Sequence, residues 1–170
     1  MKNKELLNLL KALDKRLSQK ETLILCGGMA IALAFGGKRE TVDFDIIAPV
    51  PLNEELKRQA EALAEEKELS PDWLNDGCKG FASYLPIGWE DRLIPIDLGL
   101  KNIKLLCLGK PDLLMLKFKA ARERDLLDIE IVGVTKNDVE IILENLERIS
   151  KFDSKGALTI KLMLEEMNLV

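Results

Sequence analysis

Two adjacent glycines, Gly27 and Gly28, interrupt an apolar segment and constrain the fold more than any other feature of the chain. Residues 23–25 are Leu-Ile-Leu, which is typical of a short buried strand. We expect a small apolar helix over about 29–35, ended by a second glycine pair at 36–37. Because glycine has no Cβ, the backbone of the first pair can approach a ligand closely and direct N–H groups at a phosphate.

A second strand, expected from about residue 41, carries acidic residues on one face. Its side chains alternate, with one face formed by Val42, Phe44 and Ile46 and the other by Thr41, Asp43 and Asp45. The strand rise separates the two carboxylates by roughly 7 Å. This spacing suits divalent cations, which lie about 3.5–4 Å apart in two-metal sites. The pattern predicts a site for Mg²⁺ or Mn²⁺ at Asp43 and Asp45; the alternative is a solvated pair on an edge strand.

Composition limits the remaining chemistry. The chain has no histidine, which excludes histidine-based acid–base catalysis and histidine-ligated zinc. Its 25 basic and 29 acidic residues give a net charge of −4, so there is no overall electrostatic footprint for nucleic acid. A local basic patch is still open around four residues of the C-terminal half, which are Lys117, Lys119, Arg122 and Arg124.

The same composition favours a cytoplasmic protein. The three cysteines are odd in number and unpaired in spacing, so we expect reduced thiols. The longest apolar run is far too short to span a bilayer, so we expect no membrane partner.

The order of the expected elements predicts an α/β (or α+β) fold, with a small mixed sheet of about four to five strands and flanking helices. We expect residues 1–134 to form one domain and residues 135–170 to pack on it as C-terminal helices, in a single compact unit. Extended segments at 89–98 and 102–108 are expected to form a hairpin beside the strand that carries Asp43 and Asp45. A helix is expected from about 110 to at least 122.

The combined pattern resembles the nucleotidyltransferase superfamily of the DNA polymerase β type, in which Gly-Gly or Gly-Ser precedes a helix and Asp-x-Asp lies on the next strand. It resembles AbiEii-like nucleotidyltransferases more closely. The motifs shared with these proteins span about residues 23–133 and comprise Gly27, Gly28 and Ala30, then Arg39, Thr41, Asp43 and Asp45, and finally Lys117, Ala120, Arg122, Asp125 and Asp128. A Trp-Leu-Asn segment at 73–75 also matches.

The resemblance implies transfer of a nucleoside monophosphate from a nucleoside triphosphate (NTP) to an acceptor hydroxyl, with release of pyrophosphate. It implies that Asp43 and Asp45 hold the metal and act in catalysis. The residues it implies for nucleotide binding are Gly27, Gly28, Arg39, Thr41, Lys117, Arg122 and Asp125. For Lys117, an ion-pair network with Asp125 and Asp128 is the alternative.

A third catalytic carboxylate is expected beside this pair, to help activate the attacking hydroxyl. Asp97 is the preferred candidate because it follows apolar residues on an extended segment, and Asp91 is the rival.

The resemblance leaves the acceptor open. A tRNA, a protein or a small molecule would fit, and a toxin–antitoxin context would add an antitoxin-type protein partner. The alternative function is a non-catalytic nucleotidyltransferase fold kept as a binding or regulatory module. The third carboxylate distinguishes the two, since only the enzyme needs it.

Overall fold

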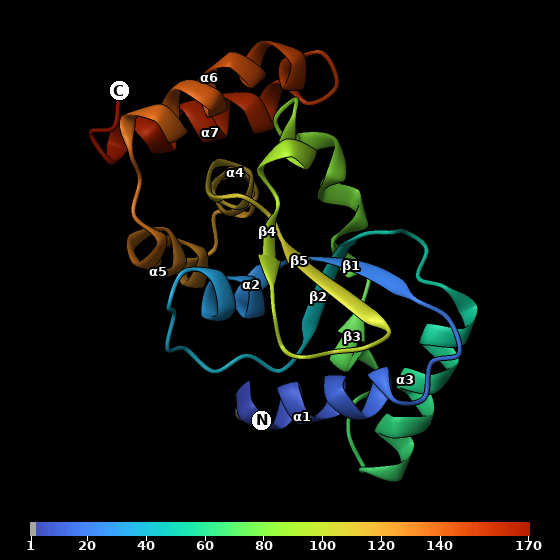
Figure 1. Ribbon diagram of the computed structural model, residues 1–170. Coiled ribbons are helices and arrows are strands. Elements are labelled where there is room, and N and C mark those ends of the chain that lie inside the picture. Colours follow the sequence, from blue (N-terminus) through green and yellow to red (C-terminus); the bar gives the residue numbers. More distant parts are fainter. Residues whose placement is uncertain (1–2) are drawn as a thin grey trace. The chain divides into compact units, whose positions relative to one another are not determined.

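The computed structural model describes residues 3–170, which contain a five-stranded mixed sheet with flanking helices (Figure 1). The strand order is β3-β2-β1-β5-β4. The strands are β1 (Glu21–Cys26), β2 (Phe44–Ala48), β3 (Leu74–Asn75), β4 (Ile94–Ile96) and β5 (Ile103–Cys107). The expected fold class and number of strands are therefore confirmed.

The α-helices surround this sheet or follow it in the chain. They are α1 (Asn3–Asp14), α2 (Gly27–Ala34), α3 (Glu54–Glu66), α4 (Lys110–Ala120), α5 (Glu123–Val132), α6 (Lys136–Ser150) and α7 (Ser154–Glu166). Short 3-10 helices add η1 (Pro71–Trp73), η2 (Gly77–Tyr84) and η3 (Trp89–Arg92).

The chain divides into two compact units. The first comprises Met1–Gly80 and Ile94–Cys107, and the second comprises Phe81–Leu93 and Leu108–Val170. The C-terminal helices α6 and α7 belong to the second unit together with α4 and α5. The division expected after residue 134 stays a prediction.

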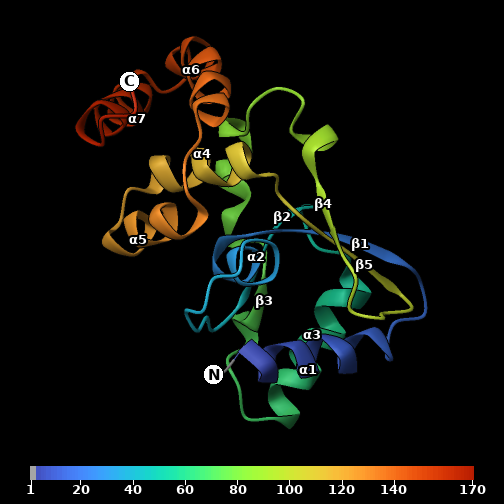
Figure 2. The ribbon, with the colours of Figure 1, turned by 60° about the vertical axis from the view of Figure 1, so that its left-hand side comes forward.

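The core of the first unit lies between the sheet and the helices α1 and α3, which Figures 1 and 2 show next to each other. Leucines on one stripe of α1 are fully buried, as their helical spacing predicts. In β1, Leu23 and Leu25 are buried, whereas Ile24 between them is only half-buried and Thr22 is exposed, so one face of this strand packs on the core. The buried leucines of α1 are Leu6, Leu10 and Leu13.

The expected hairpin forms, but it does not lie beside β2. The strands β4 and β5 pair antiparallel, and β5 pairs parallel with β1 on its other side. Since β1 also pairs with β2, two strands separate β2 from β4. The expectation was wrong because strand pairing across a sheet is not encoded in the local pattern of either strand.

The second unit contains a separate apolar core formed largely by helices. Its buried residues come from α4 to α7 and include Leu114, Met115, Phe118, Ile142 and Ile160. The single helix expected through residue 122 is in fact two. Helix α4 ends at Ala120, Ala121 adopts a left-handed conformation with φ 50°, and Arg122 is the N-cap of α5.

Candidate functional site

The first contact of the candidate site joins the glycine pair to an acidic side chain of β2. Gly27 begins α2 directly after β1 and has φ +72°. Its neighbour Cys26 pairs in register with Asp45 of β2. A Cβ on Gly27 would lie 2.0 Å from the Asp45 Oδ2, so the carboxylate packs against the glycine backbone. Only glycine permits both this conformation and this approach.

The second glycine faces the loop that leads into β2. A Cβ on Gly28 would lie 3.0 Å from the Thr41 Oγ1 and 3.4 Å from the Arg39 Nη2. The Thr41 hydroxyl in turn donates a hydrogen bond of 3.3 Å to the Asp43 Oδ1. The structure thus brings together six residues expected from the sequence. We call these the glycine-turn site: Gly27, Gly28, Arg39, Thr41, Asp43 and Asp45.

The backbone around the acidic pair differs from the expected strand. Strand β2 begins at Phe44, so Asp43 precedes it and only Asp45 lies within it. Val42 was expected on the buried face, but its side chain is 65% exposed. The reason is a side-chain contact, because the Thr41 N–H donates to the Asn3 Oδ1 of α1 at 3.0 Å. This segment is therefore a loop tied to α1.

Strand β3 adds a neighbour that the sequence did not single out. It pairs parallel with β2, and Asn75 lies opposite Asp45 in register, which puts both side chains on one sheet face. The Asn75 Oδ1 accepts a hydrogen bond from the Gly77 N–H at 2.8 Å. The Trp-Leu-Asn segment at 73–75 was the sequence signal for this strand, but three residues are too few to show the alternation of side chains that indicates a strand. Its tryptophan, Trp73, is a core residue, and its indole N–H donates to the Ala60 carbonyl.

The structure does not bring Asp97 to the acidic pair. Asp97 follows β4 at the edge of the sheet, and its carboxylate accepts a hydrogen bond from the Gly99 N–H. Three strand spacings and about four residues of strand length separate it from Asp45, on the order of 20 Å. The rival, Asp91, is exposed on η3 in the second unit. We do not carry Asp97 forward as a partner of the pair.

The downstream motif forms a buried ionic cluster within the second unit. The Lys117 ammonium donates to the Asp125 Oδ1 at 2.9 Å and to the Asp128 Oδ2 at 2.7 Å. Lys117 is only 6% exposed, and both carboxylates are buried. The Arg122 Nε donates to the Asp125 Oδ2 at 2.6 Å. The ion-pair alternative for Lys117 is therefore confirmed, and its role in nucleotide binding stays a prediction.

The cluster compensates its own charges. Burial alone would raise the pKa of Asp125, but hydrogen bonds from Arg122 and Lys117 outweigh burial and hold this pKa below its usual value. Lys119, two residues after Lys117 in α4, forms an ion pair of 2.9 Å with Asp153. The basic patch expected here is thus largely neutralised by aspartates, because the sequence does not show which acids fold back on the lysines.

The glycine-turn site offers carboxylate oxygens, the ligands that Mg²⁺ prefers. Within residues 3–170, no group of three or more acidic, cysteine or histidine side chains is arranged to hold a metal ion. Mg²⁺ is commonly bound through one or two carboxylates and completed by substrate phosphates, so the two aspartates fit such an ion.

The cysteine beside the glycine-turn site is Cys26, whose thiol donates to the Asp45 carbonyl at 3.6 Å. All three are free thiols, as expected. Burial raises the pKa of Cys107 to about 12, so it stays protonated at neutral pH. In the described part of the chain, no helix has the length and apolar character to cross a membrane.

The sheet and the glycine-turn site together define a protein of the nucleotidyltransferase-like fold. The chain belongs to the family described as nucleotidyltransferases of unknown function (DUF6036), whose pattern matches residues 3–161. Comparisons with curated proteins and with solved structures gave no significant match. The nucleotidyltransferase resemblance is confirmed at the level of the superfamily, and the AbiEii-like subtype stays a prediction.

Proposed function

We propose that the protein transfers a nucleoside monophosphate from an NTP to an acceptor hydroxyl at the glycine-turn site, with a divalent cation such as Mg²⁺ or Mn²⁺. The acceptor oxygen forms a bond to the α-phosphorus, the bond from the α-phosphorus to the bridging oxygen breaks, and pyrophosphate leaves. The observation that carries this proposal is the packing of the Asp45 carboxylate against Gly27 at the start of α2.

In this proposal Asp43 and Asp45 hold the cation. When bound, the cation neutralises the charge of the triphosphate and polarises the phosphoryl oxygens. The hydrogen bond from the Thr41 hydroxyl limits the rotation of the Asp43 carboxylate. Asn75, opposite Asp45 in register, presents an amide rather than a third acidic charge.

The glycine pair and Arg39 would hold the phosphates. The first residues of α2 carry the positive end of the helix dipole, which favours anions. Arg39 is exposed, and its guanidinium lies close to Gly28. A guanidinium in this position would neutralise charge as pyrophosphate leaves.

The test is NTP turnover, followed by pyrophosphate release in the presence of Mg²⁺. We expect the Asp43→Asn, Asp45→Asn double variant to lose turnover. The matched control is Asp97→Asn, which makes the same chemical change on a carboxylate at the far edge of the sheet. Unchanged turnover in the double variant would overturn the proposal. Loss of turnover in Asp97→Asn would show that a residue away from the pair is needed.

A second candidate function is a non-catalytic nucleotide-binding module. The observation that favours it is that, among residues 3–170, no third acidic side chain joins the pair in a group that could hold a metal ion. Binding of Mg²⁺ and an NTP without turnover, whatever acceptor is supplied, would support this candidate. A toxin–antitoxin context, with a tRNA, protein or small-molecule acceptor, rests on the resemblance to AbiEii-like proteins alone.

A further inference from the structure

The solvent face of α7 carries two exposed leucines. The side chain of Leu158 is 56% exposed and that of Leu162 is 47% exposed. At about 100° per residue, each of them lies roughly 160° around the helix from Ile160, which is fully buried in the core of the second unit. The buried side of α7 packs against α4 and α6, and Figure 2 shows α7 beside α6. The packing of the second unit therefore does not require either leucine.

Two oppositely charged residues flank these leucines on the same helix. Lys155 precedes Leu158 by about one helical turn, Glu166 follows Leu162 by about one turn, and both charged residues are exposed. Their separation along the chain puts them within about 20° of one line on the helix surface. They therefore lie on the same flank of the leucines, at opposite ends. We call Lys155, Leu158, Leu162 and Glu166 the α7 stripe.

The α7 stripe is complementary to a reversed copy of itself. Along the helix it has a cation, two leucines and a carboxylate, and both the charged pair and the leucine pair are centred close to Ile160. A two-fold axis at this point would place Leu158 of one copy against Leu162 of the other, and Lys155 against Glu166. Each charge pair would then form twice. Charges that flank an apolar helix contact in this way determine which partner binds and in which orientation.

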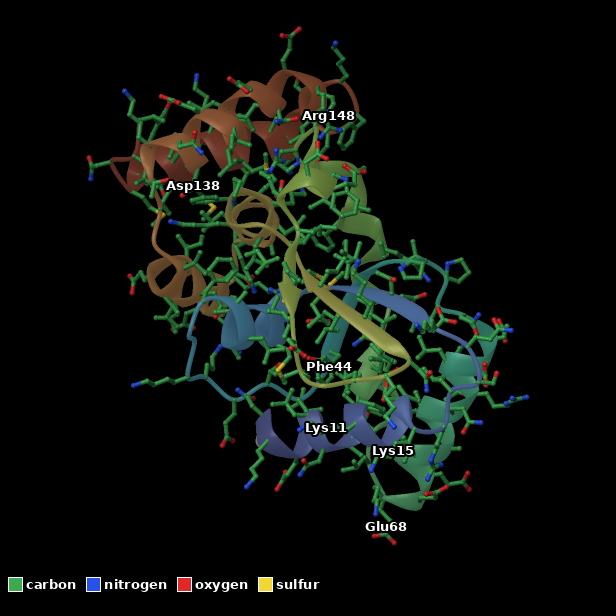
Figure 3. All side chains as sticks on the ribbon, in the orientation of Figure 1. Lys11, Lys15, Phe44, Glu68, Asp138 and Arg148 are labelled. Atoms are coloured by element: carbon green, nitrogen blue, oxygen red, sulfur yellow. The ribbon has the colours of Figure 1, made fainter. Side chains whose placement is uncertain are left out.

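Helix α7 packs on α6, which is anchored at both of its ends. Figure 3 labels Asp138 near the start of α6 and Arg148 near its end. The Asp138 carboxylate forms an ion pair of 3.2 Å with Lys110. The Arg148 guanidinium donates to the carbonyls of Ser83 and Leu85, at 2.8 Å each. The α7 stripe therefore lies on a firmly supported helix pair, and little ordering is needed for it to bind a partner.

We infer that the α7 stripe is the contact of a homodimer, in which the α7 helices of two copies pack antiparallel. A second copy is favoured as the partner because, when reversed, it supplies the opposite charge at each end of the stripe. Another exposed apolar helix face, formed by Leu127 and Ile131 on α5, lacks this arrangement, because Arg124 precedes it and α5 ends at Val132 with no acidic residue beyond Ile131. A contact of two leucines from each copy is smaller than a standard interface of about 1,200–2,000 Å², so we expect a transient dimer with a micromolar dissociation constant. The dimer does not rest on the proposed function.

Sedimentation equilibrium of the full chain, over a range of protein concentrations, tests the dimer. We expect the wild type to associate reversibly and the variant Leu158→Gln, Leu162→Gln to stay monomeric. The matched control is Leu127→Gln, Ile131→Gln, which makes the same change at the same spacing on α5 and should still dimerise. Circular dichroism checks that both variants are folded. A wild type that stays monomeric at every concentration, or equal loss of association in both variants, would overturn the inference.

Charge exchange tests the antiparallel arrangement and leaves the leucines in place. Lys155→Glu puts a carboxylate at both ends of the stripe, and Glu166→Lys puts an ammonium group at both ends. Because like charges then face each other twice, each variant alone should dimerise about tenfold more weakly than the wild type. An equal mixture of the two variants should recover the wild-type association, since opposite charges face each other again in the heterodimer. A mixture that associates as weakly as its components would overturn the inference.

Discussion

The glycine-turn site and the Lys117 cluster were both expected to bind nucleotide, and they differ in burial and in the backbone that surrounds their charged side chains. In the cluster, formed by Lys117, Arg122, Asp125 and Asp128, cations and carboxylates bind each other in a buried network. In the glycine-turn site, two carboxylates lie half-buried beside glycines that leave room for a close approach. The cluster is a closed network of buried ion pairs, whereas the glycine-turn site combines acidic side chains with glycine backbone that a ligand can approach closely.

The largest expected effect is a loss of folding stability when the Lys117 cluster is disrupted. Lys117→Met removes the ammonium that two buried carboxylates, Asp125 and Asp128, share, which we expect to lower the free energy of unfolding by about 3–5 kcal/mol. Lys119→Met is the matched control, since its ion pair with Asp153 is partly exposed and is worth about 1 kcal/mol or less. Urea denaturation measures both values. Equal losses would show that the buried cluster has no special structural role.

The next effect is a loss of ligand binding when the first glycine of the pair is replaced. Another glycine with the same backbone conformation provides the control. Gly27→Ala introduces a Cβ that collides with the Asp45 carboxylate, whereas Gly36 has a nearly identical φ of +71° and no atom within 4 Å of the added Cβ. Both substitutions pay about 1–2 kcal/mol for the left-handed conformation. Only Gly27→Ala should also abolish binding of Mg²⁺ and NTP in calorimetric titration. Loss of binding in Gly36→Ala would contradict the role given to the contact.

Several features of the fold and of the candidate site could be predicted from local sequence patterns. The glycine pair, the acidic pair and the leucine stripe of α1 are each encoded within a few residues, and the structure contains all three. The pairing of β3 with β2, the far position of Asp97 and the partners of Lys117 depend on segments distant in the chain. Periodicity does not report such contacts.

A smaller effect is expected from Arg39. Arg39→Gln removes a charged donor near Gly28, and we expect NTP binding to weaken about tenfold, which is the loss of one charge-assisted contact. The neighbouring exposed residue gives the control, Lys38→Gln, which should change binding little. Isothermal titration calorimetry compares the two variants. Equal weakening in both would indicate general electrostatic attraction rather than a specific contact.

The smallest effect is the pH dependence of stability that arises from Asp125. Its pKa in the folded protein is lower than in the unfolded chain, because hydrogen bonds from Arg122 and Lys117 outweigh the effect of burial. The stabilisation is therefore complete above the unfolded value of 3.8 and is lost as the pH falls through the folded pKa. Asp125→Asn should reduce this loss of stability at low pH, which urea denaturation curves recorded from pH 5 downward measure. If Asp125→Asn loses stability at low pH as the wild type does, Asp125 is not the source of this pH dependence.

The central claim is that the glycine-turn site binds a metal–nucleotide complex. Isothermal titration calorimetry with ATP, CTP, GTP and UTP, each with and without Mg²⁺, tests it most directly when wild type and Asp45→Asn are compared. The account predicts Mg²⁺-dependent binding of at least one nucleotide by the wild type and none by Asp45→Asn, with both proteins equally folded. Binding that survives in Asp45→Asn, or no binding of any nucleotide by the wild type, would contradict it.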